Sequence, residues 1–261
     1  MNTHRPRKRF GQHFLHDRNV IDRIVGVIGP QEDDRLVEIG PGLGALTEPL
    51  LKQAGKLHAV ELDRDVIPHL EERCNSLGEL VIHQSDALKF DFGQLAADIG
   101  SPLRLVGNLP YNVSTPLLFH FLKYRDVVSD MHFMLQKEVV DRMAAPPGSK
   151  TYGRLSVMLA ADCDIESLFI IRPGAFNPPP KVDSAIVRLT VRTAPAFPLP
   201  DRALFARLVT QAFSQRRKTL RNTMKGMLTA EQIEACEVDP QARPETLSPA
   251  AFGRLAIAAA D

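Results

Sequence analysis

Cysteine is scarce in this 261-residue chain, and its three copies lie far apart. Cys74, Cys163 and Cys236 form no C-x-x-C pair, so the sequence indicates neither a zinc site nor a disulfide framework, and we expect reduced thiols. The eight histidines include His13 and His16, but no set of metal ligands is completed around them. We therefore expect no metal site.

Long apolar runs are also missing. No stretch approaches the ~20 apolar residues that span a bilayer, and no hydrophobic stretch follows the basic amino terminus as it would in a secretory signal. The sequence contains no internal repeat and no low-complexity tract. We expect a cytoplasmic protein without a membrane segment.

The net charge is only +1, but the basic residues are unevenly distributed. Residues 1–18 carry five basic side chains against one acid, Asp17, and residues 202–225 carry seven with no acid. Two basic patches around a nearly neutral middle are typical of a nucleic-acid-binding protein. We expect phosphate contacts from the second patch, at Arg216, Arg217, Lys218 and Arg221, which would follow about one and a half helical turns.

From residue 35 on, short β-branched runs alternate with longer amphipathic segments, a pattern that predicts a mainly parallel sheet covered by helices. The predicted strands are residues 35–40, 56–63, 80–86, 103–108, 130–135, 165–171 and 185–191. Because a proline-rich segment without helical periodicity separates the last two, we expect an antiparallel arrangement at that end of the sheet. The fold class is α/β and Rossmann-like, with a small C-terminal helical domain.

A domain boundary is predicted at residues 193–200, where three prolines in eight residues favour a stiff extended linker. Beyond it the apolar residues follow helical spacing only. We therefore expect a catalytic domain at residues 1–192, with the basic N-terminal segment, and a helical RNA-binding domain at residues 201–261.

A glycine-rich turn follows the first predicted strand, in Val37-Glu-Ile-Gly-Pro-Gly-Leu-Gly44. Glycines allow a backbone to approach a ligand closely, and the helix beyond offers free N–H groups. The same residues fit the G-x-G-x-x-G/A dinucleotide pattern, so a nicotinamide or flavin site remains open. A simple tight turn from strand to helix is a further alternative.

Two carboxylates end the next two predicted strands. Glu61 can accept both hydroxyls of a ribose, as it would in a nicotinamide enzyme, and Asp86 can accept from an adenine amino group, which a dehydrogenase does not need. Each acid alone is more often a helix N-cap. The set in strand order favours an S-adenosylmethionine site.

The fourth predicted strand ends in Asn108-Leu-Pro-Tyr111. The Asn108 amide oxygen and a neighbouring backbone carbonyl can hold the hydrogens of a planar amine, Pro110 stiffens the backbone, and Tyr111 can stack on a base. The alternative is a strand that ends in a Pro-Tyr turn over the core. Beside the cofactor site, the motif predicts an amine-methylation pocket.

These residues closely resemble the bacterial ribosomal RNA adenine dimethyltransferases, in particular the enzymes that modify two adjacent adenosines near the 3′ end of 16S rRNA. The resemblance spans nearly the whole chain. It rests on Arg9-Phe-Gly-Gln-His-Phe-Leu15, Val37–Gly44, Asn108–Pro116, Phe133–Glu138, Tyr152–Ser156, Phe176–Ser184 and Gln215–Asn222.

The resemblance implies a role for each site residue. It implies that His13 and Leu15 touch the cofactor, that Gly40 lines its methionine part, that Glu61 binds ribose, that Asp86 binds adenine, that Asn108 lies between cofactor and target amine, and that Phe176 encloses the target base opposite Tyr111. The family often has asparagine where this sequence has His13.

We predict an enzyme that dimethylates the N6 nitrogens of two adjacent 16S rRNA adenosines, with S-adenosyl-L-methionine as cofactor. Its expected partner is 16S rRNA in a small ribosomal subunit or its precursor, with a link to subunit maturation, and the protein is expected to be monomeric. Three alternatives remain at this point: a 23S rRNA adenine dimethyltransferase of the antibiotic-resistance type, a nicotinamide-dependent oxidoreductase, and a non-enzymatic ribosome assembly factor.

Overall fold

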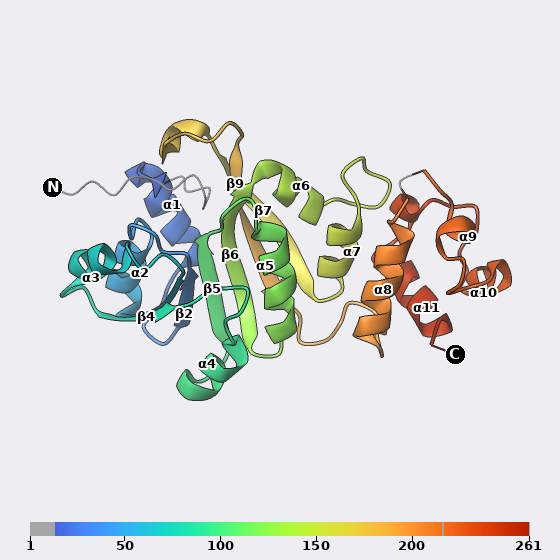
Figure 1. Cartoon of the computed structure of the whole chain (residues 1–261), viewed down its shortest axis with the longest axis horizontal. Coiled ribbons are helices and arrows are strands. Elements are labelled where there is room, and N and C mark those ends of the chain that lie inside the picture. Colours follow the sequence, from blue (N-terminus) through green and yellow to red (C-terminus); the bar gives the residue numbers. More distant parts are fainter. Residues whose placement is uncertain (1–13, 216, 261) are drawn as a thin grey trace. The chain divides into compact units, whose positions relative to one another are not determined.

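The structure is a computed structural model that describes residues 14–215 and 217–260 (Figure 1). The chain divides into two compact units. The sheet unit consists of Met1–Val140 and Glu166–Val191, and the helical unit consists of Asp141–Ile165 and Arg192–Asp261. This division differs from the expected boundary, because residues 141–165 group with the C-terminal helices.

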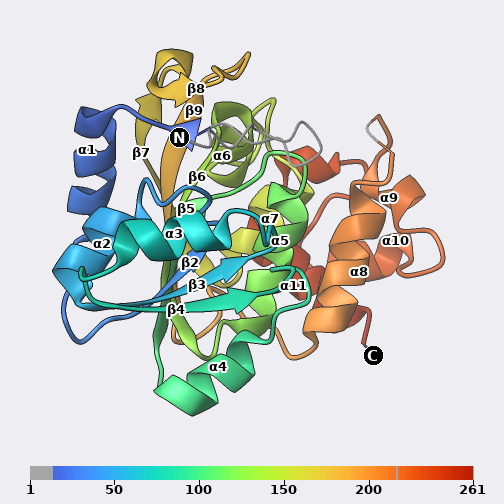
Figure 2. The same ribbon diagram turned by 60° about the vertical axis from the view of Figure 1, so that its left-hand side comes forward.

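The sheet unit contains seven strands in the order β4-β3-β2-β5-β6-β9-β7, with β4 at one edge (Figure 2). They are β2 (Arg35–Ile39), β3 (Lys56–Glu61), β4 (Glu79–Gln84), β5 (Leu103–Asn108), β6 (Val128–Gln136), β7 (Cys163–Ile171) and β9 (Ser184–Val191). From β4 to β6 neighbouring strands are parallel, whereas β9 runs antiparallel to β6. Every strand expected from the sequence is present, and the predicted α/β fold class is confirmed.

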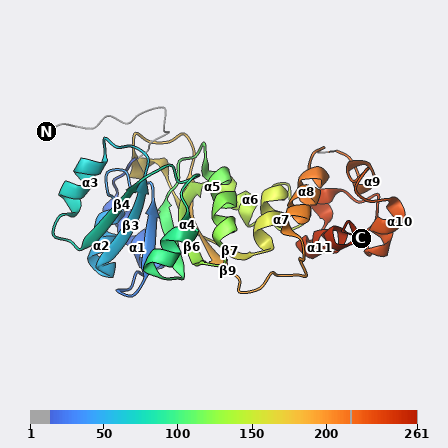
Figure 3. The same cartoon turned by 60° about the horizontal axis from the view of Figure 1, so that its bottom comes forward.

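Helices cover both faces of this sheet (Figures 1 and 3). One face, with Leu36, Leu57 and Val106, belongs to a core cluster that includes residues of α1, α2 and α3. On the other face, the Phe92 ring meets the Phe121 ring edge to face with centroids 5.5 Å apart, and Phe121 stacks on Phe133 with centroids 5.3 Å apart. The helices of the sheet unit are α1 (Arg18–Ile28), α2 (Thr47–Ala54), α3 (Ile67–Cys74), α4 (Phe92–Ile99) and α5 (Ser114–Phe121), with the 3-10 turns η2 (Leu122–Tyr124) and η3 (Pro173–Ala175). The burial of both faces explains why the central strands read as continuous apolar runs.

A second, two-stranded sheet was not expected from the sequence. β1 (Phe14–Leu15) pairs antiparallel with β8 (Phe176–Asn177). The His16 backbone N–H also donates to the Ala175 carbonyl at 3.0 Å. These bonds hold the start of the described chain against the segment that precedes β9.

The strand order also determines where a ligand can bind. β2 lies between β3 and β5, so the connections that leave β2 and β5 turn to opposite sides. In open α/β sheets, the crevice at the carboxyl ends of such strands is the usual ligand site. The four motifs predicted from the sequence all lie at these carboxyl ends.

The helical unit has its own hydrophobic core. Its helices are α7 (Arg154–Ala160), α8 (Arg202–Ala212), α9 (Leu220–Thr223), α10 (Ala230–Ala235) and α11 (Pro249–Ala258), with η4 (Pro244–Thr246), and α6 (Lys137–Met143) leads into it. Tyr152, Val157 and Ala161 are buried in this core, and the Tyr152 hydroxyl donates to the Leu247 carbonyl at 2.8 Å. α7 packs against α8 and α11. These contacts are why residues 141–165 group with this unit, although the last three of them begin β7 of the sheet.

The basic run was expected to follow a helix, and the structure corrects this expectation. α8 ends at Ala212, and α9 begins only at Leu220. The backbone N–H groups of Leu220 and Arg221 donate to the carbonyls of Ala242 and Pro240, both at 2.9 Å. Because these tertiary bonds take the place of helical ones, Arg217 and Lys218 lie in the connection between two helices. No helix in the described part of the chain is long and apolar enough to cross a membrane.

Candidate active site

A cavity of about 620 Å³ lies at the carboxyl ends of β2, β3, β4 and β5. Its walls include the four residues that end these strands or follow them, Gly40, Glu61, Asp86 and Asn108. Cavities of roughly 300–1,000 Å³ hold small ligands and cofactors. The structure therefore brings the predicted glycine turn, both acids and the Asn-Leu-Pro-Tyr segment around one volume.

Gly40 begins the glycine-rich turn in a left-handed conformation, with φ +66°. Its N–H donates to the Val60 carbonyl at 2.9 Å. A Cβ at this position would meet no atom within 4 Å, so the Cα faces open space. The turn therefore leaves room for a ligand to approach the backbone closely, which is the reason the motif predicts glycine here.

Glu61 is 6% exposed, and its carboxylate is held by two backbone donors. The Asp63 N–H donates to Oε1 at 2.7 Å, and the Gly42 N–H donates to Oε2 at 3.1 Å. Burial raises the pKa of Glu61, and these hydrogen bonds oppose the rise. A carboxylate has about four lone-pair sites, so sites remain for the hydroxyls of a ligand. The bond from Gly42 also fixes the glycine turn against this acid.

Asp86 follows β4 and organises a tight turn. The Leu88 N–H donates to its Oδ1 at 3.0 Å, and the Lys89 N–H donates to its carbonyl at 2.8 Å. The helices that follow the two acids have other N-caps, Val66 for α3 and Asp91 for α4. The alternative that Glu61 and Asp86 are helix N-caps is therefore wrong.

Asn108 is brought to the cavity by an unusually close approach of two strands. A Cβ on Gly107, the residue before it, would lie 2.4 Å from the Ile39 carbonyl oxygen, and φ of Gly107 is +156°. Only glycine permits this spacing, which sets the end of β5 beside the glycine turn that follows β2. The Leu109 N–H donates to the Met134 carbonyl at 3.2 Å and anchors the segment to β6.

Tyr111 lines the same cavity and is half-buried. Its hydroxyl lies 2.6 Å from the Ser184 Oγ, and burial raises the pKa of the phenol. The tetrapeptide thus forms a cavity wall, whereas the alternative of a plain turn over the core gives no reason for its exposure to this space.

The remaining predicted residues are placed as follows. Leu15 lines the cavity through the pairing of β1 with β8. Phe176 is only 2% exposed, packs in the core cluster of the sheet unit and is absent from the cavity lining, where its neighbour Asn177 stands. His13 and Arg216 lie outside the described residues.

Glu38 is a cavity-lining acid that the sequence argument missed. It is 2% exposed, and burial raises its pKa to about 7, with a smaller contribution from repulsion by Glu61. Its Oε2 is buried without a hydrogen-bond partner among the described residues. The sequence signal that could have identified this site residue is an acid inside an otherwise apolar strand, Leu36-Val-Glu-Ile39. Two buried carboxyl groups at one cavity suit a ligand that carries positive charge.

Arg217, Lys218 and Arg221 are exposed in the helical unit. They lie before and within the short helix α9, on a stretch without any acidic residue. The structure therefore presents the predicted basic run to solvent, although not on one continuous helix.

Comparison with known proteins adds an independent observation. Residues 3–261 match the family described as "Ribosomal RNA adenine dimethylase". The chain belongs to this family. Ribosomal RNA small subunit methyltransferase A of Pseudomonas aeruginosa is 58% identical over 97% of this chain and 94% of its own length. The enzyme of the same name from Nitrosococcus oceani is 56% identical over 95% of this chain and 94% of its own length.

Two solved structures resemble this one over most of their length. A dimethyladenosine transferase from Plasmodium falciparum matches with TM-score 0.76 and 26% identity, over 93% of this chain and 96% of its own. The 23S rRNA methyltransferase ErmE matches with TM-score 0.74 and 24% identity, over 95% of this chain and all of its own, and shows the fold alone. The predicted enzyme class, an rRNA adenine dimethyltransferase, is confirmed by the family. The oxidoreductase and 23S alternatives are not favoured.

Proposed function

We propose that this chain transfers methyl groups from S-adenosylmethionine to the N6 nitrogens of two adjacent adenosines near the 3′ end of 16S rRNA. One observation carries the proposal: Gly40, Glu61, Asp86 and Asn108, from four successive strands of the parallel sheet, line one cavity. The names of the relatives, which specify the small subunit, support the choice of 16S rRNA.

The residues at the cavity fit this cofactor. The open space beside the Gly40 Cα admits the methionine part, Glu61 accepts the ribose hydroxyls, and Asp86 accepts from the adenine amino group. Burial raises the pKa of Glu38 and Glu61, and a positively charged sulfonium or ammonium group beside them would favour the charged form of both carboxyl groups. S-adenosylmethionine supplies a methyl group on a positively charged sulfur, which makes it ready for displacement by a nucleophile.

Asn108 is the central residue on the substrate side. The exocyclic nitrogen of adenine is a weak nucleophile because its lone pair is delocalised into the ring. The Asn108 amide oxygen, with a neighbouring backbone carbonyl, accepts the amine hydrogens and turns the lone pair toward the methyl group. As the bond between nitrogen and the methyl group forms, the bond between the methyl group and sulfur would break and S-adenosylhomocysteine would leave. The nitrogen would acidify in this step and release its proton to solvent, so the enzyme contributes position and charge complementarity rather than a strong base.

Tyr111 holds the target base by stacking, a contact worth roughly 1–3 kcal/mol in single-strand binders. The base must leave its stack in the RNA to reach this ring. Phe176 remains the predicted second wall, and its burial in the core means that it would have to turn outward to fill this role. A pocket edged by Leu109 and backbone still admits the monomethyl product for the second transfer.

The helical unit supplies the RNA contacts in this proposal. Arg217, Lys218 and Arg221 are exposed and positively charged, which suits them to contacts with RNA phosphates. The RNA is bound in a small subunit or its precursor, which places the reaction in the cytoplasm and links it to subunit maturation.

Mass spectrometry of 16S rRNA treated with the protein and isotopically labelled S-adenosylmethionine tests the proposal. We expect label in two neighbouring adenosines of the 3′ region, with two methyl groups on each nitrogen. Unlabelled adenosines in that region, under conditions where the protein binds the cofactor, would overturn it.

A further inference from the structure

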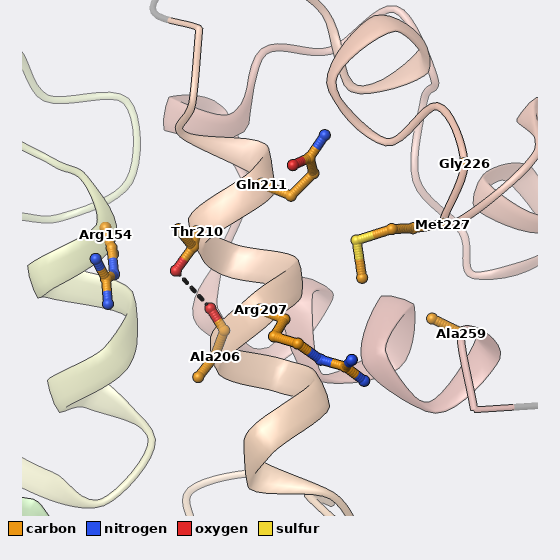
Figure 4. Close-up of a pocket in the computed structure, with 8 residues that line it drawn as sticks. All are labelled: Arg154, Ala206, Arg207, Thr210, Gln211, Gly226, Met227 and Ala259. Carbon is orange, nitrogen blue, oxygen red and sulfur yellow. Dashed lines mark hydrogen bonds between the residues drawn. The ribbon is translucent and has the colours of Figure 1, made fainter.

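The helical unit carries a groove that the proposed methyl transfer does not use. It has a volume of about 750 Å³ and crosses the exposed face of α8 (Figure 4). The lining residues come from α7, α8, the turn after α9 and the end of α11: Arg154, Ala206, Arg207, Thr210, Gln211, Gly226, Met227 and Ala259.

The groove follows from the two faces of α8. Leu204, Phe205, Leu208, Val209 and Ala212 are buried in the core of the unit. The opposite face is left with two small side chains, Ala206 and Thr210, and they form a low floor. Small residues at the rim, Gly226 and Ala259, keep the groove open.

The polar side chains of the floor are already satisfied by the protein. The Thr210 hydroxyl donates to the Ala206 carbonyl at 2.6 Å, as the dashed line in Figure 4 marks, and the Gln211 Nε2 donates to the Thr223 carbonyl at 2.8 Å. Thr210 therefore presents mainly its methyl group. No residue in the described ranges pairs with the guanidinium of Arg207, so this side chain is a donor left to meet a ligand.

The charge of the groove has one sign. No carboxylate lines it, and the sequence contains no acidic residue between Asp201 and Glu231. Arg207 is exposed and forms no ion pair with any residue in the described ranges. Arg202, five residues earlier on the same helix, is paired with Asp162. Arg207 thus differs from its neighbour in that its charge is not compensated within the unit.

We propose that this groove binds the phosphodiester backbone of RNA, with Arg207 as the main contact and Arg154 as a second one. The assignment rests on the proposed function, which makes RNA the substrate. Guanidinium groups bind phosphate oxygens in a bidentate manner, and the low floor lets a backbone lie across α8. Lys225 precedes the rim residue Gly226 in the chain and adds positive charge next to the groove.

The test measures RNA affinity over a salt series with a transcript of the 3′ region of 16S rRNA. Arg207→Ala removes the charge and keeps helix propensity, because alanine is the best helix former. Thr210→Glu places a negative charge on the floor, and Thr210→Gln is its neutral partner. Arg243→Ala is the control, because this arginine is exposed in the same unit outside the groove, where it pairs with Glu245 at 4.0 Å.

The logarithm of the RNA-binding constant falls linearly with the logarithm of the salt concentration, and we expect Arg207→Ala to reduce the magnitude of this slope by about 0.7–0.9. If the affinities of variant and wild type are equal at 1 M salt, the variant then binds about four- to fivefold more weakly at 0.15 M salt. Thr210→Glu should weaken binding more than Thr210→Gln, and Arg243→Ala should change neither quantity. A scrambled transcript of equal length should show the same loss, because phosphate contacts carry no sequence information.

Unchanged affinity and slope in both Arg207→Ala and Thr210→Glu would overturn the proposal, and so would a loss confined to the 16S sequence. A wild-type protein that methylates neither the transcript nor 16S rRNA in a small subunit or its precursor would instead contradict the proposed function. Urea unfolding checks that the helical unit of each variant remains folded, and calorimetry with S-adenosylmethionine should give wild-type cofactor affinity in all of them.

Discussion

The Tyr111 hydroxyl lies 2.6 Å from the Oγ of Ser184, a residue 73 positions further along the chain. Ser184 is completely buried at the start of β9, and Tyr111 stands on the loop after β5. The bond therefore joins the Asn-Leu-Pro-Tyr segment to the end of the Phe176–Ser184 segment. The bond thereby holds the Tyr111 ring at the cavity through a contact with strand β9.

A double-mutant cycle on this pair should show strong coupling. Tyr111→Phe and Ser184→Ala each remove the same hydrogen bond, and we expect each to lower the free energy of unfolding by about 1 kcal/mol. The double variant should be no less stable than the more damaging single variant, because the bond can be lost only once. Denaturant unfolding provides the measurement, and additive losses would show that the two side chains act separately.

Cofactor affinity should depend on the two strand-end acids. Glu61→Gln retains one oxygen for the backbone donors at Gly42 and Asp63 but removes the charge, and Asp86→Asn does the same at β4. Each change should weaken S-adenosylmethionine binding by roughly 1.5–3 kcal/mol, the range for hydrogen bonds to charged groups.

Calorimetric titration measures this loss directly. Glu79→Gln is the control, because Glu79 is exposed at the start of β4 and pairs with Lys56. Wild-type affinity in both site variants would mean that the acids serve the two loops and not the cofactor.

The basic run should contribute to RNA affinity and not to cofactor affinity. Replacement of Arg217 and Lys218 by alanine should lower the salt slope of RNA binding by about 0.7–0.9 for each lost phosphate contact. Filter binding over a salt series measures the slope. An unaltered slope in the double variant would show that these side chains do not meet the RNA.

Glu38 should make stability depend on pH. Its pKa is about 7 in the folded protein against an ordinary 4.5, because burial disfavours the charge. The stabilisation from the protonated form is therefore complete below pH 4.5 and is lost as the pH rises through about 7. Glu38→Gln removes this titration, so its stability relative to wild type should rise across that interval, on the order of 3 kcal/mol in total.

Urea unfolding at pH 4.5, 6 and 8 measures the difference between the two proteins. Glu79→Gln, at an exposed acid, is measured in the same way for comparison. A difference for Glu38→Gln that stays flat from pH 4.5 to 8 would contradict the assignment of a raised pKa.

The central strands β2, β3 and β5 could be predicted because each is a short, largely buried apolar run, and β5 at Leu103–Asn108 has the predicted limits. The meeting of Gly40, Glu61, Asp86 and Asn108 could be predicted because parallel strands place their carboxyl ends at one edge of a sheet. Order along the chain was enough for this inference.

Features that depend on long-range contacts could not be predicted. The apolar spacing around Leu220 predicts a helix, but it does not reveal that the Leu220 N–H donates to the Ala242 carbonyl. Because of this long-range bond, Arg217 and Lys218 lie in a loop between two helices and not on a helix. The apolar face of α7 does not indicate whether the helix packs on the sheet or, as the structure has it, in the core of the helical unit. The Tyr111–Ser184 hydrogen bond likewise joins the Asn108–Tyr111 and Phe176–Ser184 motifs, and the sequence gives no sign that these two motifs are in contact.

The most direct test of the account is single-turnover methyl transfer to 16S rRNA by Asn108→Ala, with cofactor and RNA affinities measured on the same preparation. Asn19→Ala, an exposed amide on α1, is the control. We predict that Asn108→Ala loses a factor on the order of 10² or more in rate, the effect of removing one transition-state hydrogen-bonding group, while it still binds RNA. A rate near that of the wild type would contradict the assignment of this cavity as the site of adenine methylation.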